Sequence, residues 1–239
     1  WNGWMIAALA RGGAVLGETA FTAAAVKSVD FIYSKLMRSD GRLLARYRDG
    51  EAAYPGYLDD YAFMTWGLLE LYETTFAAEY LRKALALTEE AVKLFWDTAD
   101  GGFFFYGDDA EQLLARLKEV YDGAMPSGNS VFLLNLLRLA RLTGDEEFTN
   151  LAEKQLNAFA GEVASYPSGY AFFLQGLDFY LGPTREVVIA GRPDANDTRE
   201  MLAAVRSRYN PNTIVIFHPE GAAGKEIETL VPFISEQGP

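Results

Sequence analysis

The sequence predicts a mainly α fold: a partial (α/α) toroid of helical hairpins that carries a small C-terminal α/β unit. Three observations lead to this prediction. Helix pairs recur along the first three-quarters of the chain, the first helix of each pair is apolar on almost every face, and the second is amphipathic. A helix that is apolar all round must be covered on every side, whereas an amphipathic helix lies on a core. This alternation is typical of a toroid whose inner helices surround a central cavity.

Each predicted hairpin contains an apolar helix, a tight polar turn, an aromatic residue just beyond the turn, and a second helix. The aromatic residues are Phe21, Tyr80 and Phe148, which lie 59 and 68 residues apart. These spacings are too long for a short helical repeat and indicate hairpins joined by sizeable loops. The three hairpin segments are 6–32, 66–96 and 133–160, and a fourth buried-type helix at 170–181 follows without a visible partner.

The predicted loops are long on one side of the toroid only. Turns within a hairpin take two or three residues, whereas the connections between hairpins span residues 38–57 and 97–126, with a shorter link at 165–168. These connections all lead into the start of an inner helix, where free N–H groups carry partial positive charge. Binding residues are often found on such loops, so we expect a site at this end. Within the second loop, residues 101–106 predict a short β-ribbon.

The C-terminal segment has the pattern of a strand, a helix and a second strand. Apolar strands are expected at 186–190 and 213–217, with a helix at 198–208 between them, which predicts a small parallel sheet. No G-x-G-x-x-G run follows the first strand, so the dinucleotide fingerprint is absent from the sequence. We expect two domains, 1–182 and 183–239.

Composition excludes several classes of function. The 239 residues carry a net charge of −12 with scattered cations, which disfavours nucleic acid as a partner. The absence of cysteine excludes disulfides, thiolate zinc sites and a cysteine nucleophile. No apolar run approaches the ~20 residues of a membrane helix, so no membrane partner and a cytoplasmic location are expected. Neither a metal nor a cofactor is expected, because one histidine, His218, is a poor basis for a metal site.

Four motifs resemble a known family. They are WNGWMIAALA at the start, GYLDDYAF at 56–63, DGAMPSGNS at 122–130 and REVVIAG at 185–191. They resemble the YyaL and spermatogenesis-associated thioredoxin-domain family, in which a thioredoxin-like domain precedes an α/α barrel similar to N-acylglucosamine 2-epimerases and six-hairpin glycosidases. The resemblance implies that this chain, which begins with Trp1, is the C-terminal part of such a protein, without the thioredoxin-like domain and the first hairpins.

The resemblance also implies sugar chemistry, if the protein is an enzyme. Sugar 2-epimerases of this fold use histidines as acid and base, and His218 in the α/β unit cannot supply two such groups. A glycosidase-like or epimerase-like activity would therefore have to use carboxylates. Asp60 and Asp122 form the candidate catalytic pair, because glycosidases require two carboxyl groups. The structural alternative is N-capping, which we expect for one of Asp59 and Asp60.

Candidate substrate-binding residues lie at the same end. Ser127 and Asn129 begin the third inner helix, where an amide or hydroxyl suits hydroxyl recognition, although Ser127 also fits a helix N-cap. Sugar faces stack on aromatic rings, but loops over helical bundles also need apolar cover. The aromatic candidates are Trp1, Tyr57, Tyr61, Tyr166 and Tyr170.

Two functional hypotheses follow. The first is a carbohydrate-binding or carbohydrate-processing module of a thioredoxin-domain protein, with a sugar-like small molecule as its partner. The alternative is a non-catalytic scaffold that positions the missing thioredoxin-like domain or docks a protein. Because a partial toroid leaves the flanks of its inner helices uncovered, we also expect association with the remaining half of a longer chain, or self-association.

Overall fold

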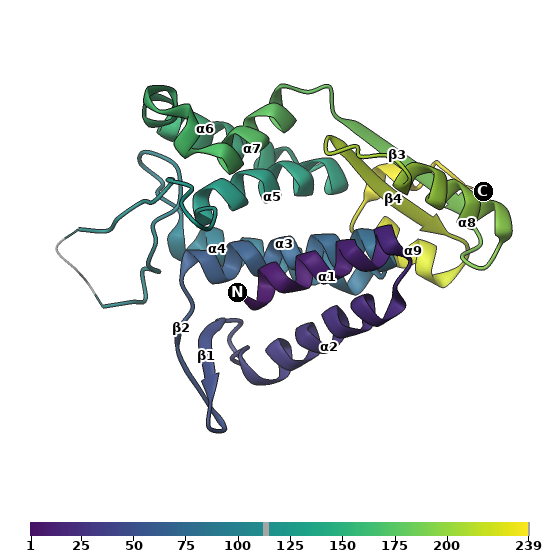
Figure 1. Ribbon diagram of the computed structural model, residues 1–239, viewed down its shortest axis with the longest axis horizontal. Coiled ribbons are helices and arrows are strands. Elements are labelled where there is room, and N and C mark those ends of the chain that lie inside the picture. The colour runs from purple at the N-terminus through teal and green to yellow at the C-terminus, as the bar shows by residue number, and fades with distance from the viewer. Residues whose placement is uncertain (112–114, 239) are drawn as a thin grey trace.

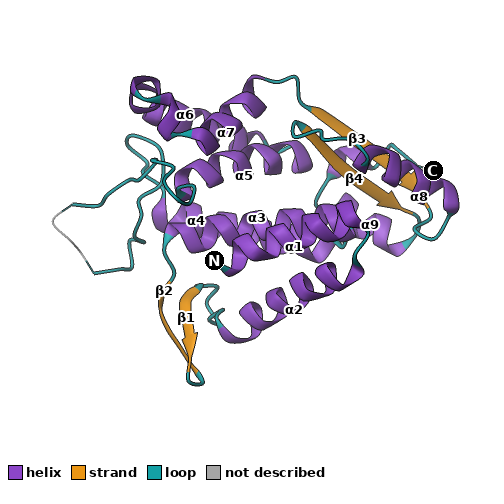
Figure 2. Ribbon diagram, viewed as in Figure 1, coloured by secondary structure: helices purple, strands orange, loops and turns teal. Residues whose placement is uncertain are grey.

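The computed structural model describes residues 1–111 and 115–238, and helices predominate in it (Figures 1 and 2). Three helical hairpins and a seventh helix make up the first part of the chain, as the hairpin pattern predicts. Their bounds are α1 Asn2–Leu16, α2 Thr19–Lys35, α3 Leu58–Thr75, α4 Ala78–Phe95, α5 Gly128–Thr143, α6 Glu146–Ser165 and α7 Ala171–Leu181. None of the helices described is long and apolar enough to cross a membrane.

The turns within the hairpins have a common geometry. Gly17 and Gly144 end α1 and α5 in the left-handed region, with φ of 70° and 75°, which glycine adopts without strain. Phe76 takes the same position after α3, at φ 57°, and its ring packs against Tyr72 and Phe217. The middle turn therefore lies one residue earlier than the sequence predicts.

The inner helices α1, α3, α5 and α7 lie in this order and run in the same direction. Gly67 approaches the carbonyl of Gly3, and Thr74 Oγ1 donates to the carbonyl of Ala10, so α1 and α3 are parallel. Helices α3 and α5 are buried along almost their whole length, as predicted. Helices α1 and α7 each leave one face in solvent, because they flank a ring that does not close (Figure 1).

The long loops differ from prediction in two places. Residues 38–57 contain an antiparallel hairpin of β1 Leu44–Arg48 and β2 Glu51–Pro55, which the sequence pattern does not predict (Figure 2). The ribbon expected at 101–106 is wrong: this segment forms one isolated bridge, between Trp96 and Phe103. The backbone of Phe103 is instead hydrogen-bonded by a buried side chain, described below.

The C-terminal α/β unit contains β3 Arg185–Gly191, α8 Asn196–Arg206 and β4 Thr213–Pro219, and the two strands are parallel as predicted. It continues into α9 Ala222–Glu228 and a 3₁₀ turn, which the sequence analysis does not anticipate. The unit packs on the helices, since the Arg206 guanidinium donates to the carbonyls of Glu73 and Thr74 at 2.8 and 3.0 Å. Division into domains 1–182 and 183–239 stays a prediction.

Candidate functional site

A cavity is lined by residues of all four inner helices, and we call it the inner-helix cavity. Its volume is about 740 Å³, and the end of α8, the loop after it and β4 form its remaining wall. Small-molecule sites have volumes of this order. Its aromatic lining residues are Trp4, Trp66, Phe172 and Tyr209, and its charged lining residues are Arg11, Glu70, Glu73, Arg138, Arg206 and Arg208.

Four charged side chains form an Arg–Glu network on the wall of the inner-helix cavity: Arg11, Glu70, Glu73 and Arg138. Arg138 donates from Nη1 to Glu70 Oε1 at 2.8 Å and from Nη2 to Glu73 Oε1 at 2.9 Å. Arg11 reaches Glu70 Oε2 at 3.4 Å. Glu70 and Glu73 are one helical turn apart, so one guanidinium can bind both of them. The network therefore joins α1, α3 and α5.

The two carboxyl groups of the network differ in acidity. Burial by itself would raise the pKa of Glu70, but the charges of Arg138 and Arg11 outweigh burial and lower its pKa below the ordinary value. Burial raises the pKa of Glu73, and Arg138 offsets this only in part. Glu73 Oε2 accepts no hydrogen bond from the described residues, whereas both oxygens of Glu70 are engaged. Glu73 is thus the carboxyl group available to a ligand.

Aromatic rings cover another part of the wall. Trp66 meets Phe172 edge-on with ring centroids 5.2 Å apart, and its Nε1 donates to Glu70 Oε1 at 3.1 Å. Trp4 stacks on Phe63 at 5.9 Å. The exposed Trp1, a predicted binding residue, stacks in turn on Trp4 at 6.1 Å but is not among the residues that line this cavity.

The two neighbouring aspartates at the start of α3 both bind backbone N–H groups. Asp60 Oδ2 accepts from the N–H of Tyr57 at 2.9 Å and closes the first turn of α3. Asp59 Oδ1 accepts from the N–H of Gly128 at 2.9 Å, at the start of α5. Burial raises the pKa of both groups, and that of Asp59 reaches about 6 despite this hydrogen bond. Neither aspartate is among the residues that line the inner-helix cavity.

Asp122 is also bound by backbone donors. Its Oδ2 accepts from the N–H groups of Phe172 and Phe173 at 2.7 and 3.1 Å, and its Oδ1 from that of Ser127 at 3.0 Å. The carboxylate therefore caps α7 from a distant loop, and Ser127 Oγ caps α5 by accepting from the N–H of Ser130. The catalytic role of Asp60 and Asp122 stays a prediction, and each carboxylate has a structural role in the fold.

Asn129 is fully buried and holds the second long loop. Its Oδ1 accepts from the N–H of Phe103 at 2.8 Å, and its Nδ2 donates to the carbonyls of Phe103 and Glu119 at 2.9 and 2.8 Å. An amide can satisfy a strand-like backbone in this way, so Phe103 needs no partner strand. Asn129 has no free polar atom facing solvent, and its predicted contact with a substrate stays untested.

The predicted tyrosines fall into two groups. Tyr61 is buried and accepts from Arg42 Nη1 at 3.0 Å and from the N–H of Leu43 at 2.9 Å, while Tyr170 donates to Glu162 at 3.0 Å. Tyr57 and Tyr166 are exposed, and Tyr57 stacks on Phe105. The structure thus gathers the predicted residues at the loop end, where most of them anchor loops.

Sequence reasoning missed the Arg–Glu network. The signal is present in the sequence, because Glu70, Glu73 and Arg138 are charges within helices that are otherwise apolar on nearly every face. Buried charges require partners, so charged residues at such positions predict an ion-paired cluster. Which residues pair could not be read from the sequence.

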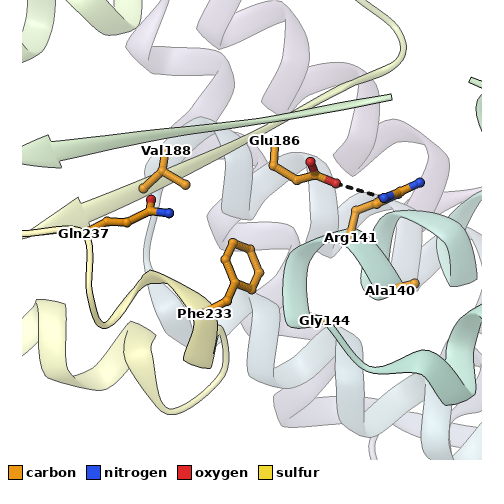
Figure 3. A pocket seen from close by; sticks show the side chains of 7 residues that line it. All are labelled: Ala140, Arg141, Gly144, Glu186, Val188, Phe233 and Gln237. Carbon is orange, nitrogen blue, oxygen red and sulfur yellow. Dashed lines mark hydrogen bonds and ion pairs between the residues drawn. The ribbon is translucent and has the colours of Figure 1, made fainter. Parts of the chain in front are cut away.

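A second cavity of about 510 Å³ lies between the end of α5, β3 and the C-terminal turn. Figure 3 shows Arg141 pointing toward Glu186 across it, with the ring of Phe233 opposite β3. Arg141 and Glu186 bind each other at 3.3 Å, so the charged groups of this cavity are already paired.

Among the residues that the structure describes, no group of three or more His, Cys, Asp or Glu side chains is arranged to hold a metal ion. The inner-helix cavity is therefore the stronger candidate.

The fold is that of carbohydrate-processing α/α-barrel enzymes. A GH76 alpha-mannanase of Bacteroides thetaiotaomicron superposes with a TM-score of 0.53 at 15% identity, over 67% of this chain and 43% of that one. A cellobiose 2-epimerase of Bacillus thermoamylovorans gives a TM-score of 0.54 at 16% identity, over 66% and 42%. The predicted partial α/α toroid is confirmed, and at these identities the likeness concerns the fold alone.

Proteins related by sequence show a closer similarity than these two structures do. Over 98% of its length the chain is 35% identical to spermatogenesis-associated protein 20 of Rattus norvegicus and 34% identical to that of Homo sapiens. An uncharacterized protein of Caenorhabditis elegans is 28% identical over 91% of the chain. No family model matches the chain. The resemblance that the four motifs indicate is confirmed, and the chain spans about a third of the length of these relatives.

Proposed function

We propose that the chain is a carbohydrate-binding module of the α/α-barrel type and that the inner-helix cavity is its binding site. The observation that carries this proposal is the chemistry of the cavity wall. Trp4, Trp66 and Phe172 offer ring faces and edges beside the carboxyl group of Glu73, in a volume that fits a small sugar. Aromatic surface combined with a few directed polar groups is what a sugar requires, and the α/α-barrel neighbours named above are carbohydrate-processing enzymes.

Binding is favoured over turnover by the state of the two carboxyl groups. Glycoside hydrolysis requires one carboxyl group as acid and a second as nucleophile or base. Glu73 has the raised pKa of a proton donor, but both oxygens of Glu70 are held by Arg138, Arg11 and Trp66. These hydrogen bonds and the lowered pKa make Glu70 a weaker nucleophile and a weaker base. The family resemblance alone supports two further parts of the hypothesis. These are the processing of a sugar and the presence of a thioredoxin-like domain elsewhere in a longer protein.

A scaffold function is the second candidate, and one observation favours it. The polar residues of the loop end, Asp59, Asp60, Asp122 and Asn129, all bind backbone groups. At the same time, α1 and α7 expose apolar faces that further helices could cover. In this function the module would pack against the remaining part of a longer chain, or against a second copy, and position a neighbouring domain.

Ligand-detected NMR and calorimetry with cellobiose and mannobiose, at millimolar concentration on the full 239-residue chain, test the binding function. We expect saturable binding that Trp66→Phe weakens about three- to tenfold, the range that loss of a good aromatic contact gives. Trp96→Phe is the matched control, because Trp96 packs on Phe103 outside the inner-helix cavity and should bind as the unaltered protein does. Absence of binding by every sugar tested would favour the scaffold instead.

A further inference from the structure

The charge of the inner-helix cavity is opposite to that of the protein. The chain has a net charge of −12, yet the charged residues that line this cavity are four arginines and two glutamates. A concave site with one sign of charge concentrates the field between its walls and attracts ligands of the opposite sign. The cavity therefore offers positive potential on a molecule that otherwise repels anions.

The positive excess can be assigned to two residues. Within the Arg–Glu network, Arg11 and Arg138 balance Glu70 and Glu73 through ion pairs of 2.8 to 3.4 Å. Arg206 and Arg208 form no ion pair with an acidic residue in the part of the chain that the structure describes. Arg206 donates to two backbone carbonyls and lies over the ring of Phe76. None of these three groups carries a formal negative charge. The guanidinium of Arg208 makes no ion pair or hydrogen bond with any residue in the described ranges, and only the carbonyl of Arg208 accepts a bond, from Asn210 Nδ2 at 3.5 Å.

The environment of Arg206 supports this assignment. Burial lowers the pKa of Arg206, and the charge of Glu73 offsets only part of that effect. A cation in this position gains stability when an anion approaches it. Arg208 is exposed and lies two residues further along the same wall, so its guanidinium is free to meet that anion directly.

We propose that the inner-helix cavity selects an anionic sugar, one that carries a carboxylate or a phosphate group, and that Arg208 binds this group. The uncharged part of the sugar lies toward Trp66 and Glu73, as in the proposed function on which this inference rests. Arg208 makes the direct contact, and Arg206 adds positive potential while it holds the end of α3. A guanidinium suits either anion, because it offers paired donors to two oxygens at once.

The test compares D-glucose, D-glucuronate and D-glucose 6-phosphate by calorimetry and ligand-detected NMR on the full chain. We expect at least one of the anionic sugars to bind on the order of tenfold more tightly than glucose at low salt, with the difference shrinking as salt is added. The anion that binds more tightly identifies the group as carboxylate or phosphate.

Variants assign the effect to the named residue. Arg208→Gln should abolish the preference for the anionic sugar over glucose, and Arg208→Lys should restore part of this preference. Arg192→Gln is the matched control, because Arg192 is an exposed arginine of the same α/β unit outside the cavity lining. Circular dichroism checks that each variant is folded.

The possible failures are distinguishable. Binding of glucose as tight as that of both anionic sugars would overturn this inference and leave the proposed function intact. A preference for anions that survives Arg208→Gln would overturn the role of Arg208. Absence of binding by all three sugars would overturn this inference, and the proposed function would fall with it only if cellobiose and mannobiose also failed to bind.

Discussion

At the scale of single residues, two aspartates at the loop end bind N–H groups at the start of another helix. Asp59 lies in the first turn of α3 but binds the N–H of Gly128, at the start of α5. Asp122 lies in a loop and binds the first N–H groups of α7. Such contacts satisfy donors that a helix leaves unpaired, and they fix the spacing of neighbouring inner helices. The sequence predicts N-capping by one of Asp59 and Asp60, but the helix that each aspartate caps is decided by tertiary structure.

The raised pKa of Asp59 predicts a dependence of stability on pH. Its folded-state pKa of about 6 exceeds the unfolded value of about 3.9, so the folded protein binds this proton more tightly. The stabilisation is therefore complete below about pH 4 and is lost as the pH rises through about 6. We expect the unaltered protein to lose about 2 kcal/mol relative to Asp59→Asn between pH 4 and pH 7.

Urea unfolding of both proteins across this range measures the difference directly. Asparagine keeps an acceptor for the N–H of Gly128, so the variant isolates the titration of the carboxyl group from the hydrogen bond. Parallel stability curves for the two proteins would show that the pKa of Asp59 is not raised.

At the scale of elements, the sequence predicted helices more reliably than the structure of the loops. The hairpins follow from a repeated pattern in which an apolar helix precedes an amphipathic one, each 15 to 20 residues long. The hairpin of β1 and β2 was missed because its strands are five residues long and have no buried residue to create an alternating pattern. The prediction of a β-ribbon at 101–106 was wrong because a run of aromatic residues fits two structures equally well. One is a strand, and the other is a buried loop whose backbone is held by Asn129.

Arg138 is the main polar link between α3 and α5, which predicts a large effect of its removal. Arg138→Met would leave Glu70 and Glu73 buried without their shared partner, and we expect a loss of about 3 to 5 kcal/mol in the free energy of unfolding. Urea unfolding followed by circular dichroism provides the measurement. Replacing Glu70, Glu73 and Arg138 together by methionine should cost much less than the single change, because no buried charge is then left unpaired. Arg11 loses its partner Glu70, but its side chain is 53% exposed and stays hydrated.

Lys93→Met is the control for this prediction. Lys93 and Glu90 form an ion pair one turn apart on α4, and the lysine side chain is 71% exposed. Exposed pairs of this kind contribute about 0 to 1 kcal/mol. Equal losses for the Arg138 and Lys93 variants would show that the Arg–Glu network does not stabilise the packing of α3 on α5.

At the scale of the whole molecule, the open flank of α1 governs association. This chain covers 43 and 42% of the two α/α-barrel enzymes named above. Within residues 1–111 and 115–238, α1 and α7 each pack against one other inner helix, α3 and α5 respectively. Met5, Val15 and Leu16 on α1 are 59, 64 and 67% exposed. Exposed apolar surface of this kind favours association. Packing against the remaining part of a longer chain, or against a second copy of this chain, would bury it.

Sedimentation velocity tests this expectation for self-association. We expect the sedimentation coefficient of the isolated chain to rise with concentration in the micromolar range, and Met5→Glu to weaken the association about tenfold by placing a charge in the contact. Met201→Glu is the control, since Met201 is exposed to a similar extent, 56%, but belongs to α8 and not to α1. A single monomeric species at every concentration would contradict self-association through this flank.

The sequence by itself determined the hairpins, the parallel strands and the absence of thiol chemistry, because these depend on local periodicity and on composition. Tertiary structure decided which polar residues meet. Arg11 pairs with Glu70 across 59 residues, and Arg138 pairs with Glu70 and Glu73 across 68 and 65 residues. Periodicity shows which face of a helix is buried, but the partner of a buried charge depends on how the helices are arranged. For that reason the residues that line the inner-helix cavity follow from the tertiary structure and not from the sequence pattern, because they come from helices far apart in the sequence.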